Sequence, residues 1–259
     1  MKDNLLVSLV QTTIHWQDRK ANLTLFRELI CPLKNQTDLV VLPEMFTTGF
    51  TMSPEQVADN PQGETIENIK NWAYTFNFAI MGSFIVKEKE AYYNRAFFVT
   101  PEGDLFFYDK RHLFRMGGED KHYQAGKHSP TIAYKGWNIR PLICYDLRFP
   151  VWSRNVANKY DLLIYMANWP EARAFAWRTL LPARAIENLA YVCGVNRIGT
   201  DGYGFPYAGD SVILSPKGQP LAYAQNEPQI ITAQVSKAKL NHFRNKFPAD
   251  KDADKFKIH

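Results

Sequence analysis

Cysteine is scarce in this chain, and the spacings that bind metals are missing. The 259 residues include only Cys31, Cys144 and Cys193, with no C-x-x-C motif. An odd number of widely spaced cysteines excludes a disulfide scaffold and a cysteine zinc site, and it indicates a reducing compartment. The six histidines also lack the spacing of metal ligands: His15, His112, His122, His128, His242 and His259. We therefore expect neither a metal nor another cofactor.

Long apolar runs are missing as well. No stretch approaches the roughly 18 apolar residues of a membrane-spanning helix, so we expect no membrane partner. The N-terminal MKDNLLVSLVQ has a short apolar run and carries Asp3, which is typical of a first β-strand and not of a signal peptide. The cytoplasm is the expected location.

Basic charge is concentrated at one end of the chain. The formal net charge is +5, and residues 236–259 contain seven Lys or Arg against three Asp, a surplus of four that leaves about one for the rest. The remaining sequence has no basic stripe, so nucleic-acid binding is not expected. We predict a folded domain over residues 1–236 and a polar basic tail over 237–259.

Strand and helix patterns alternate along the whole chain without a Ser/Gly-rich linker, which favours one α/β domain. Apolar runs predict strands at 5–10, 38–43, 78–87, 91–100, 105–108, 131–134, 138–143, 161–166, 191–196, 210–214, 221–224 and 230–235. Helical spacing predicts helices at 19–31, 64–77, 151–158 and 174–189. Pro182 should bend or divide the last of these.

Cys144 stands where an apolar strand turns polar, in WNIRPLICYDLRFPVWSR (residues 137–154). At a junction of strand and helix, a thiol would lie near unpaired backbone N–H groups and positive dipole potential. Both lower the pKa of a thiol and can hold an oxyanion. The alternative is a small core residue, which is what we expect of Cys193 in YVCGVN.

Two more polar residues follow apolar strands, namely Glu44 after DLVVLP and Lys110 after LFFYD. In layered α/β folds, ligands bind where strand ends open into loops, so these residues and Cys144 could share one pocket. A thiol with a carboxylate base and an ammonium near the oxyanion could support acyl transfer. The alternatives are a helix N-terminal carboxylate for Glu44, surface charge for Lys110 and a solvated loop acid for Glu119.

The motifs around these residues resemble, in order, those of the carbon–nitrogen hydrolase (nitrilase) superfamily, from about residue 4 to 235. They are LPEMF, YDKRHLF, ICYDLRFP, ANWPEARAFAWRTLLPARAIENLAYV and NRIGTDGYGFPYAGDSVILSPKG. The resemblance implies a four-layer α-β-β-α sandwich that forms a homodimer through its helices. It also implies a catalytic triad of Glu44, Lys110 and Cys144, with a second acid at Glu119.

Within the superfamily, the sequence looks most like bacterial omega-amidases, which hydrolyse the side-chain amide of 2-oxoglutaramate. Tyr145-Asp146 stands where true nitrilases commonly carry Trp-Glu. The likeness implies release of 2-oxoglutarate and ammonia through a thioester on Cys144, with the Tyr145 N–H near the oxyanion. Three other amides stay open as substrates: a methylthio 2-oxo amide of methionine salvage, a deaminated peptide amide and an N-carbamoyl amino acid. A non-catalytic dimeric binding module is the alternative from another class.

The implied substrate carries a carboxylate, so its pocket should offer a cation. Arg173, after Asn168-Trp169-Pro170, is the first candidate. Arg148 is the second, although it could instead form a structural salt bridge. Phe46 and Trp169 are candidate pocket walls, with a place in the core as the alternative for each.

Overall fold

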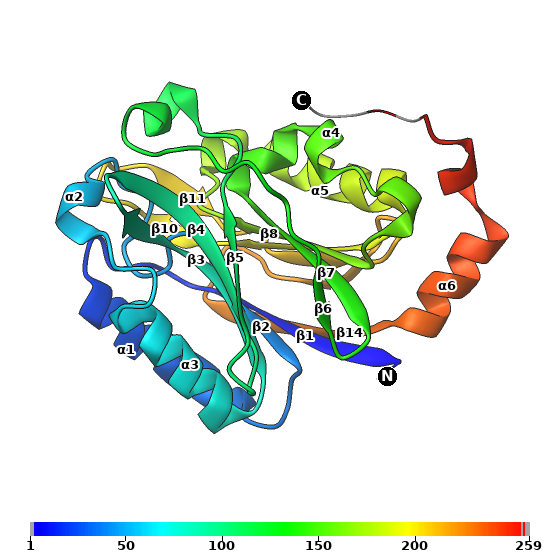
Figure 1. Cartoon of the computed structure of the whole chain (residues 1–259), viewed down its shortest axis with the longest axis horizontal. Coiled ribbons are helices and arrows are strands. Elements are labelled where there is room, and N and C mark those ends of the chain that lie inside the picture. The colour runs from blue at the N-terminus through cyan, green and yellow to red at the C-terminus, as the bar shows by residue number, and fades with distance from the viewer. Residues whose placement is uncertain (1–2, 255, 257–259) are drawn as a thin grey trace.

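Two six-stranded β-sheets stack face to face in the computed structural model, which describes residues 3–254 and 256. The first sheet has the order β14-β1-β2-β3-β4-β5, and the second has the order β13-β12-β9-β8-β7-β6. Helices cover the outer face of each sheet (Figure 1). The predicted α-β-β-α sandwich is therefore confirmed.

The strands agree closely with those predicted from the sequence. The first sheet contains β1 (Asn4–Gln11), β2 (Leu39–Val41), β3 (Ala79–Glu88), β4 (Ala91–Val99), β5 (Leu105–Asp109) and β14 (Gln229–Ser236). The second contains β6 (Ile132–Tyr134), β7 (Trp137–Ile143), β8 (Leu162–Ala167), β9 (Tyr191–Asn196), β12 (Val212–Leu214) and β13 (Pro220–Tyr223). A small hairpin, not predicted, pairs β10 (Ile198–Thr200) with β11 (Pro206–Ala208).

Helices α1 (Arg19–Ile30) and α3 (Glu64–Phe76) form the outer layer on the first sheet. Asp18 caps α1, since its Oδ1 accepts the Ala21 N–H at 2.9 Å. The apolar faces of both helices are buried: Leu23, Phe26 and Ile30 in α1, and Ile66, Ile69, Trp72 and Phe76 in α3. A short helix, α2 (Pro54–Val57), lies in the loop between them.

Helix α5 (Ala174–Asn188) covers the second sheet and, contrary to one expectation, is not divided at Pro182. It packs very closely on β9. A Cβ atom at Gly194 would lie only 2.5 Å from Leu181 Cδ1, so this approach requires a glycine. The helix expected at 151–158 is shorter than predicted, because it consists of α4 (Pro150–Ser153) and a 3₁₀ turn, Val156–Asn158.

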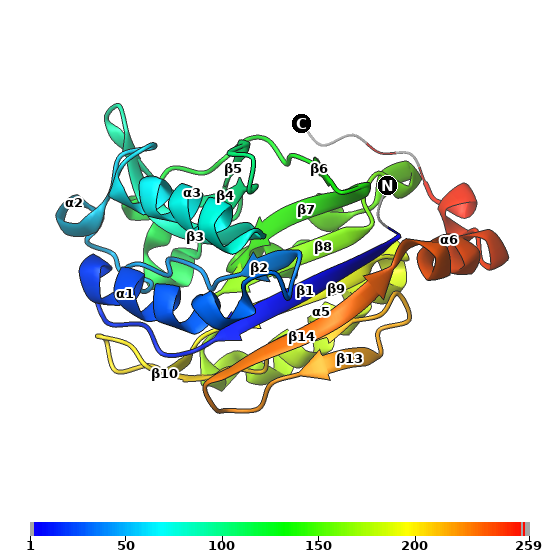
Figure 2. The same cartoon turned by 90° about the horizontal axis from the view of Figure 1, so that it is seen from below.

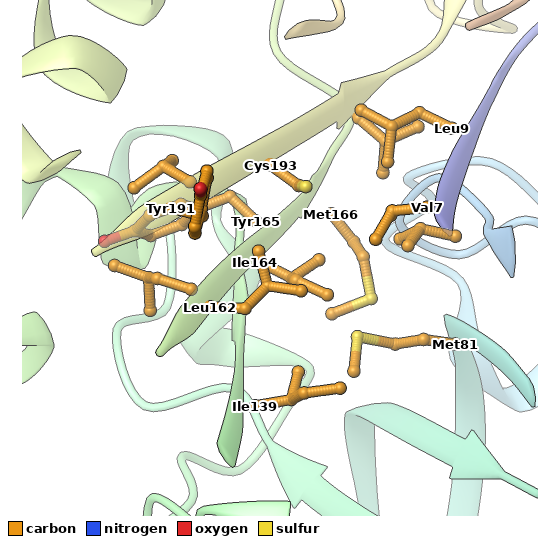
Figure 3. Close-up of a cluster of buried hydrophobic side chains, with 14 of the residues drawn as sticks. Val7, Leu9, Met81, Ile139, Leu162, Ile164, Tyr165, Met166, Tyr191 and Cys193 are labelled. Carbon is orange, nitrogen blue, oxygen red and sulfur yellow. The ribbon is translucent and has the colours of Figure 1, made fainter. Parts of the chain in front are cut away.

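Apolar side chains fill the space between the two sheets (Figure 3). The first sheet contributes Val7, Leu9 and Met81, and the second contributes Ile139, Ile164, Met166 and Cys193. All of these side chains are buried, and Cys193 is the plain core residue that we expected. Their packing holds the sheets in a fixed relation, which fixes the relative positions of loops from both sheets.

The two sheets share one pairing pattern. In each, three parallel strands (β1-β2-β3 and β7-β8-β9) lie between antiparallel neighbours. Equivalent aspartates precede the middle strands: Asp38 accepts the Leu6 N–H at 2.9 Å, and Asp161 accepts the Asn138 N–H at 2.8 Å. Glu44 lies three residues beyond the end of β2, and Asn168 directly follows the end of β8.

The C-terminal segment begins with a helix that was not predicted, α6 (Lys237–Lys246), which extends beyond the end of β14 (Figure 2). Leu240 and Arg244 are buried, and Arg244 Nη1 lies 3.1 Å from Asp161 Oδ1. A 3₁₀ turn follows at Ala249–Asp252, and His259 lies outside the described residues. Within 3–254 and 256, no helix is both long and apolar enough to cross a membrane.

Candidate active site

Three charged side chains from separate strand ends and loops meet in the interior. Lys110 Nζ lies 2.9 Å from Glu44 Oε1 and 3.0 Å from each carboxylate oxygen of Glu119. None of the three side chains is exposed to solvent. Cys144 is beside them, since the charges of all three act on its thiol, and its Sγ lies 3.8 Å from the Asn168 carbonyl oxygen. The structure thus brings together the four residues that the sequence singled out as catalytic candidates.

Tight turns at two strand ends place Glu44 and Cys144. Cys144 has φ of 42°, and Met45, directly after Glu44, has φ of 45°. Left-handed backbone at a residue other than glycine costs about 1–3 kcal/mol and persists only where the surroundings impose it. The Met45 N–H is held by Ser83 Oγ at 2.8 Å.

Asp146 anchors the turn that carries Cys144. Its Oδ2 accepts the Ile143 N–H at 3.0 Å and the Tyr108 hydroxyl at 2.6 Å. Its Oδ1 accepts the His112 N–H at 3.0 Å. The aspartate after Cys144-Tyr145 therefore holds the backbone of the 3₁₀ turn Cys144–Arg148.

Glu119 is held by its own loop. The Phe114 N–H donates to Glu119 Oε2 at 2.6 Å, and the Glu119 N–H donates to the Phe114 carbonyl at 3.2 Å. Gly118 precedes it with φ of +77°, which allows the sharp reversal there. This loop closes a carboxylate over Lys110, so Glu119 is a buried acid and not a solvated one.

Two buried asparagines complete the cluster, and sequence reasoning did not identify them as part of it. Asn94 Nδ2 lies 2.7 Å from Glu44 Oε1. The Asn168 N–H donates to Glu44 Oε2 at 2.8 Å, and Asn168 Nδ2 donates to the Glu44 carbonyl at 2.6 Å. Asn168 follows a buried strand, as Glu44 does, and this position could have marked it. Asn94 lies inside a strand, where no sequence signal sets it apart.

The charges of the cluster oppose the effect of burial on Lys110. Burial alone would lower the pKa of Lys110, but the neighbouring charges of Glu119 and Glu44 outweigh it, so the pKa is raised. Burial and the charge of Glu44 raise the pKa of Glu119, against the opposing effect of Lys110. The lysine is therefore a permanent cation between two acids.

The expectation of an acidic thiol at Cys144 is wrong. Burial raises the pKa of this thiol well above its usual value, and the negative charges of Glu44 and Glu119 raise it further, while Lys110 lowers it. A 3₁₀ turn of five residues follows the strand at Cys144, so the helix start whose dipole would have favoured a thiolate is not there. The surroundings of Cys144 therefore favour the protonated thiol over the thiolate.

A cavity of about 160 Å³ opens directly onto the cluster. Its lining includes Lys110, Cys144 and Asn168. Aromatic and methionine side chains form much of the remaining wall: Phe50, Met52, Phe114, Met116, Tyr145, Trp169, Tyr203, Phe205 and Tyr207. Among the residues that the structure describes, no three His, Cys, Asp or Glu side chains are grouped so that they could hold a metal ion.

Four of the five candidate substrate-binding residues line this cavity, namely Tyr145, Arg148, Trp169 and Arg173. Arg148 lies over the Trp169 ring at 5.2 Å, and Arg173 lies over the Phe114 ring at 4.9 Å. Such contacts hold a guanidinium in place without neutralising it.

Phe46 is the exception, and the expectation that it forms a wall of the pocket is wrong. Its side chain is fully buried in the core between the first sheet and its helices, with edge contacts to Phe26 at 5.2 Å and Phe97 at 5.9 Å. It follows Glu44 by two residues, and the turn at Met45 directs it away from the cavity. Phe46 is the core residue that the sequence left as its alternative.

Comparison with known proteins agrees with this geometry. The model of the carbon–nitrogen hydrolase family matches residues 6–245, and the chain belongs to that family. It is an enzyme of the class that hydrolyses carbon–nitrogen bonds other than peptide bonds.

Two named relatives match nearly the full length of the chain. The chain is 47% identical over 253 residues to omega-amidase YafV of Yersinia enterocolitica, covering 97% of this chain and 98% of the relative. It is 30% identical over 253 residues to a 2-oxoglutaramate amidase of Bacillus subtilis, covering 96% and 97%. A crystal structure from Xanthomonas campestris, of a CN-hydrolase superfamily protein with an arsenic adduct in the active site, superposes with a TM-score of 0.97. It is 42% identical, and the match covers all of both chains.

Proposed function

We propose that this enzyme hydrolyses the terminal amide of 2-oxoglutaramate to 2-oxoglutarate and ammonia. The observation that carries the proposal is the placement of Cys144 beside a buried Glu44–Lys110–Glu119 cluster, at a cavity that also holds two arginines. The names of the full-length relatives support the same reaction. Amide hydrolysis of this kind needs a nucleophile, a base and a site for the oxyanion.

In acylation, Glu44 takes the proton of the Cys144 thiol as sulfur attacks the amide carbon. Burial raises the pKa of this thiol, so attack by sulfur requires Glu44 to remove the proton. The developing oxyanion lies near the Lys110 ammonium and the N–H of Tyr145, which is among the first N–H groups of a turn and has no partner within it. A preorganised donor of this kind contributes about 3–4 kcal/mol to the transition state.

Collapse of the tetrahedral intermediate breaks the carbon–nitrogen bond. Glu44 returns its proton to the nitrogen, ammonia leaves and a thioester remains on Cys144. Glu44 then takes a proton from water, which attacks the thioester, and the thiol leaves with that proton. Glu119 holds Lys110 in place through two contacts of 3.0 Å during both steps.

The arginines give the cavity its preference for an anionic substrate. Arg173 is half-buried and Arg148 is exposed, and both are held against aromatic rings at the cavity wall. Within the described residues, neither guanidinium forms a salt bridge with a carboxylate. We assign the 2-oxo acid end of the substrate to Arg173 first, because burial strengthens its attraction for a carboxylate.

We further propose that the enzyme is a cytoplasmic homodimer. Exposed apolar side chains on α4 and α5 support pairing through this layer: Val151, Phe175 and Ile186. All three cysteines are free, and Cys144 must stay reduced to act. Both features suit a cytoplasmic protein that buries this helical face against a second copy.

The direct test is ammonia release from 2-oxoglutaramate, measured alongside a panel of other amides. Wild-type enzyme should prefer 2-oxo acid ω-amides, and Cys144→Ala should abolish release while the fold persists. With an amide that the wild-type enzyme turns over slowly, mass spectrometry should find an acyl adduct on Cys144. Cys31→Ala, which removes an exposed thiol, is the matched control and should keep full activity.

Two results would contradict this proposal. An adduct on Cys31 or Cys193 would show that the nucleophile is misassigned. A marked preference for a methylthio 2-oxo amide, a deaminated peptide amide or an N-carbamoyl amino acid would move the substrate to that class while leaving the chemistry at Cys144 intact.

A further inference from the structure

We propose that Asn94, on β4, is a positioning residue that determines which oxygen of Glu44 receives the thiol proton. Its side chain is wholly buried, with Nδ2 2.7 Å from Glu44 Oε1 and 3.4 Å from Glu119 Oε1. The inference rests on the proposed function in one respect, that Glu44 acts as the base. It does not depend on which amide is the substrate.

The orientation of the Asn94 amide is fixed from behind by a directed chain of hydrogen bonds. The Met45 N–H, which can only donate, gives its proton to Ser83 Oγ at 2.8 Å. The Ser83 hydroxyl then donates its own proton to Asn94 Oδ1 at 3.0 Å. Because Oδ1 already accepts this bond, the NH₂ group of Asn94 must face the carboxylates. A backbone group thus sets the direction of the whole chain.

This arrangement makes the two oxygens of Glu44 unequal. Oε1 accepts from both Lys110 Nζ at 2.9 Å and Asn94 Nδ2 at 2.7 Å, while Oε2, among the described residues, accepts only the Asn168 N–H at 2.8 Å. A carboxylate oxygen accepts about two such bonds. The remaining acceptor site is therefore on Oε2, and this is the oxygen that takes the proton of Cys144.

The side-chain amide of Asn94 is neutral, so it does not change the net charge of the Glu44–Lys110–Glu119 cluster. Asn94 donates to two acids without adding charge, so it stabilises the ionised form of Glu44 and leaves Lys110 as the cation of the cluster. Without this donor, the ionised form of Glu44 is less favoured. Activity that requires an ionised base should then begin at a higher pH.

The experiment is the pH profile of kcat/KM for Asn94→Leu and Asn94→Asp. Asn94→Leu removes the donor, so kcat/KM at pH 7 should fall about 10- to 100-fold, and the acid limb should move up by about one pH unit. Asn94→Asp keeps an acceptor for Ser83 but faces the two acids with a third carboxylate. It should lower kcat/KM more and move the acid limb further in the same direction.

Asn155 provides the matched control. It is also buried, but the hydrogen bonds of its side chain to the described residues all go to the backbone of Tyr160 and Asn188. Asn155→Leu should lower the melting temperature without moving the acid limb. The proposal would be overturned if the Asn94 variants lose stability but the acid limb of their kcat/KM profile stays at the wild-type pH. Asn94 would then be a structural residue.

Two further measures keep the test decisive. If neither Asn94 variant folds, Ser83→Ala removes the hydroxyl that orients the amide and should cause a smaller upward shift of the same limb. An unmoved limb in that variant would also overturn the proposal. If wild-type enzyme releases no ammonia from 2-oxoglutaramate, the proposed function fails, and the profiles are measured on the best amide of the panel.

Discussion

Replacement of Lys110 by methionine tests the electrostatics of the site most directly. Lys110 Nζ is within 3.0 Å of three carboxylate oxygens and is shielded from solvent, so its removal leaves Glu44 and Glu119 facing each other without a counter-charge. Breaking a buried ion pair in this way costs about 3–5 kcal/mol. For a chain of this size, that loss corresponds to a fall of roughly 6–20 °C in melting temperature.

The pH dependence of this loss has a definite sign. In the wild type, the folded pKa of Lys110 is raised, so its contribution is complete below about pH 10. In Lys110→Met, one of the two carboxylates must bind a proton to relieve their repulsion, and burial already raises the pKa of Glu119. An acid with a raised folded pKa destabilises above its unfolded pKa of about 4.3, and this penalty fades as the pH falls towards that value.

The assay is urea unfolding of wild type and Lys110→Met at pH 8 and pH 5. We expect Lys110→Met to lower the free energy of unfolding by the full amount at pH 8 and by a clearly smaller amount at pH 5. Lys135→Met is the matched control, because Lys135 Nζ lies 2.8 Å from Asp38 Oδ1 but its side chain is 36% exposed. It should cost about 1 kcal/mol or less. Two results would refute the reasoning. One is a decrease in the free energy of unfolding for Lys110→Met no larger than that for Lys135→Met, and the other is a decrease for Lys110→Met that is equal at the two pH values.

Two more predictions concern the cavity and the outer helices. Arg173→Met should raise KM for 2-oxoglutaramate about 10- to 100-fold, because the substrate carboxylate loses its bond to a charged group. Arg178→Met is the control and should leave KM unchanged, because the Arg178 guanidinium already pairs with Asp210 at 2.8 Å. Steady-state kinetics on both variants tests this prediction. Equal KM values for Arg173→Met and Arg178→Met would show that Arg173 does not bind the substrate. Phe175→Asp, at a side chain 82% exposed on α5, should convert a dimer to monomers in light scattering. Tyr74→Asp, 78% exposed on the opposite layer, should not, and a wild-type monomer would end the dimer proposal.

Local pattern was sufficient for most elements and for the three strand-end residues. Strand and helix periodicity depend on neighbouring residues, so β1–β9 and α1, α3 and α5 could be predicted. Glu44, Lys110 and Cys144 stand out because each is polar directly after an apolar run. Helix α6 was missed because its sequence is polar, and only Leu240 and Arg244 bury side chains on it.

The protonation state of Cys144 and the roles of the asparagines required the tertiary structure. The pKa of the thiol is a sum of burial and three charges, and those charges come from residues 44, 110 and 119, whose distances from sulfur no sequence pattern gives. Asn94 lies in YYNRAFFV, where alternation indicates only that it faces the other side from Arg95. Its importance follows from strand pairing, which places it between Ser83 and Glu44.

Sequence by itself determined the class of chemistry, because the motifs around Glu44, Lys110 and Cys144 resemble those of carbon–nitrogen hydrolases and the chain belongs to that family. Tertiary structure decided how that chemistry is controlled. It buried Phe46 in the core, placed Arg148 and Arg173 at the cavity wall and, within the described part of the chain, left Glu44 Oε2 with a single hydrogen bond, from the Asn168 N–H. The physical reason is that side-chain identity is encoded locally, whereas desolvation and charge coupling depend on distances that exist only after the two sheets have packed together.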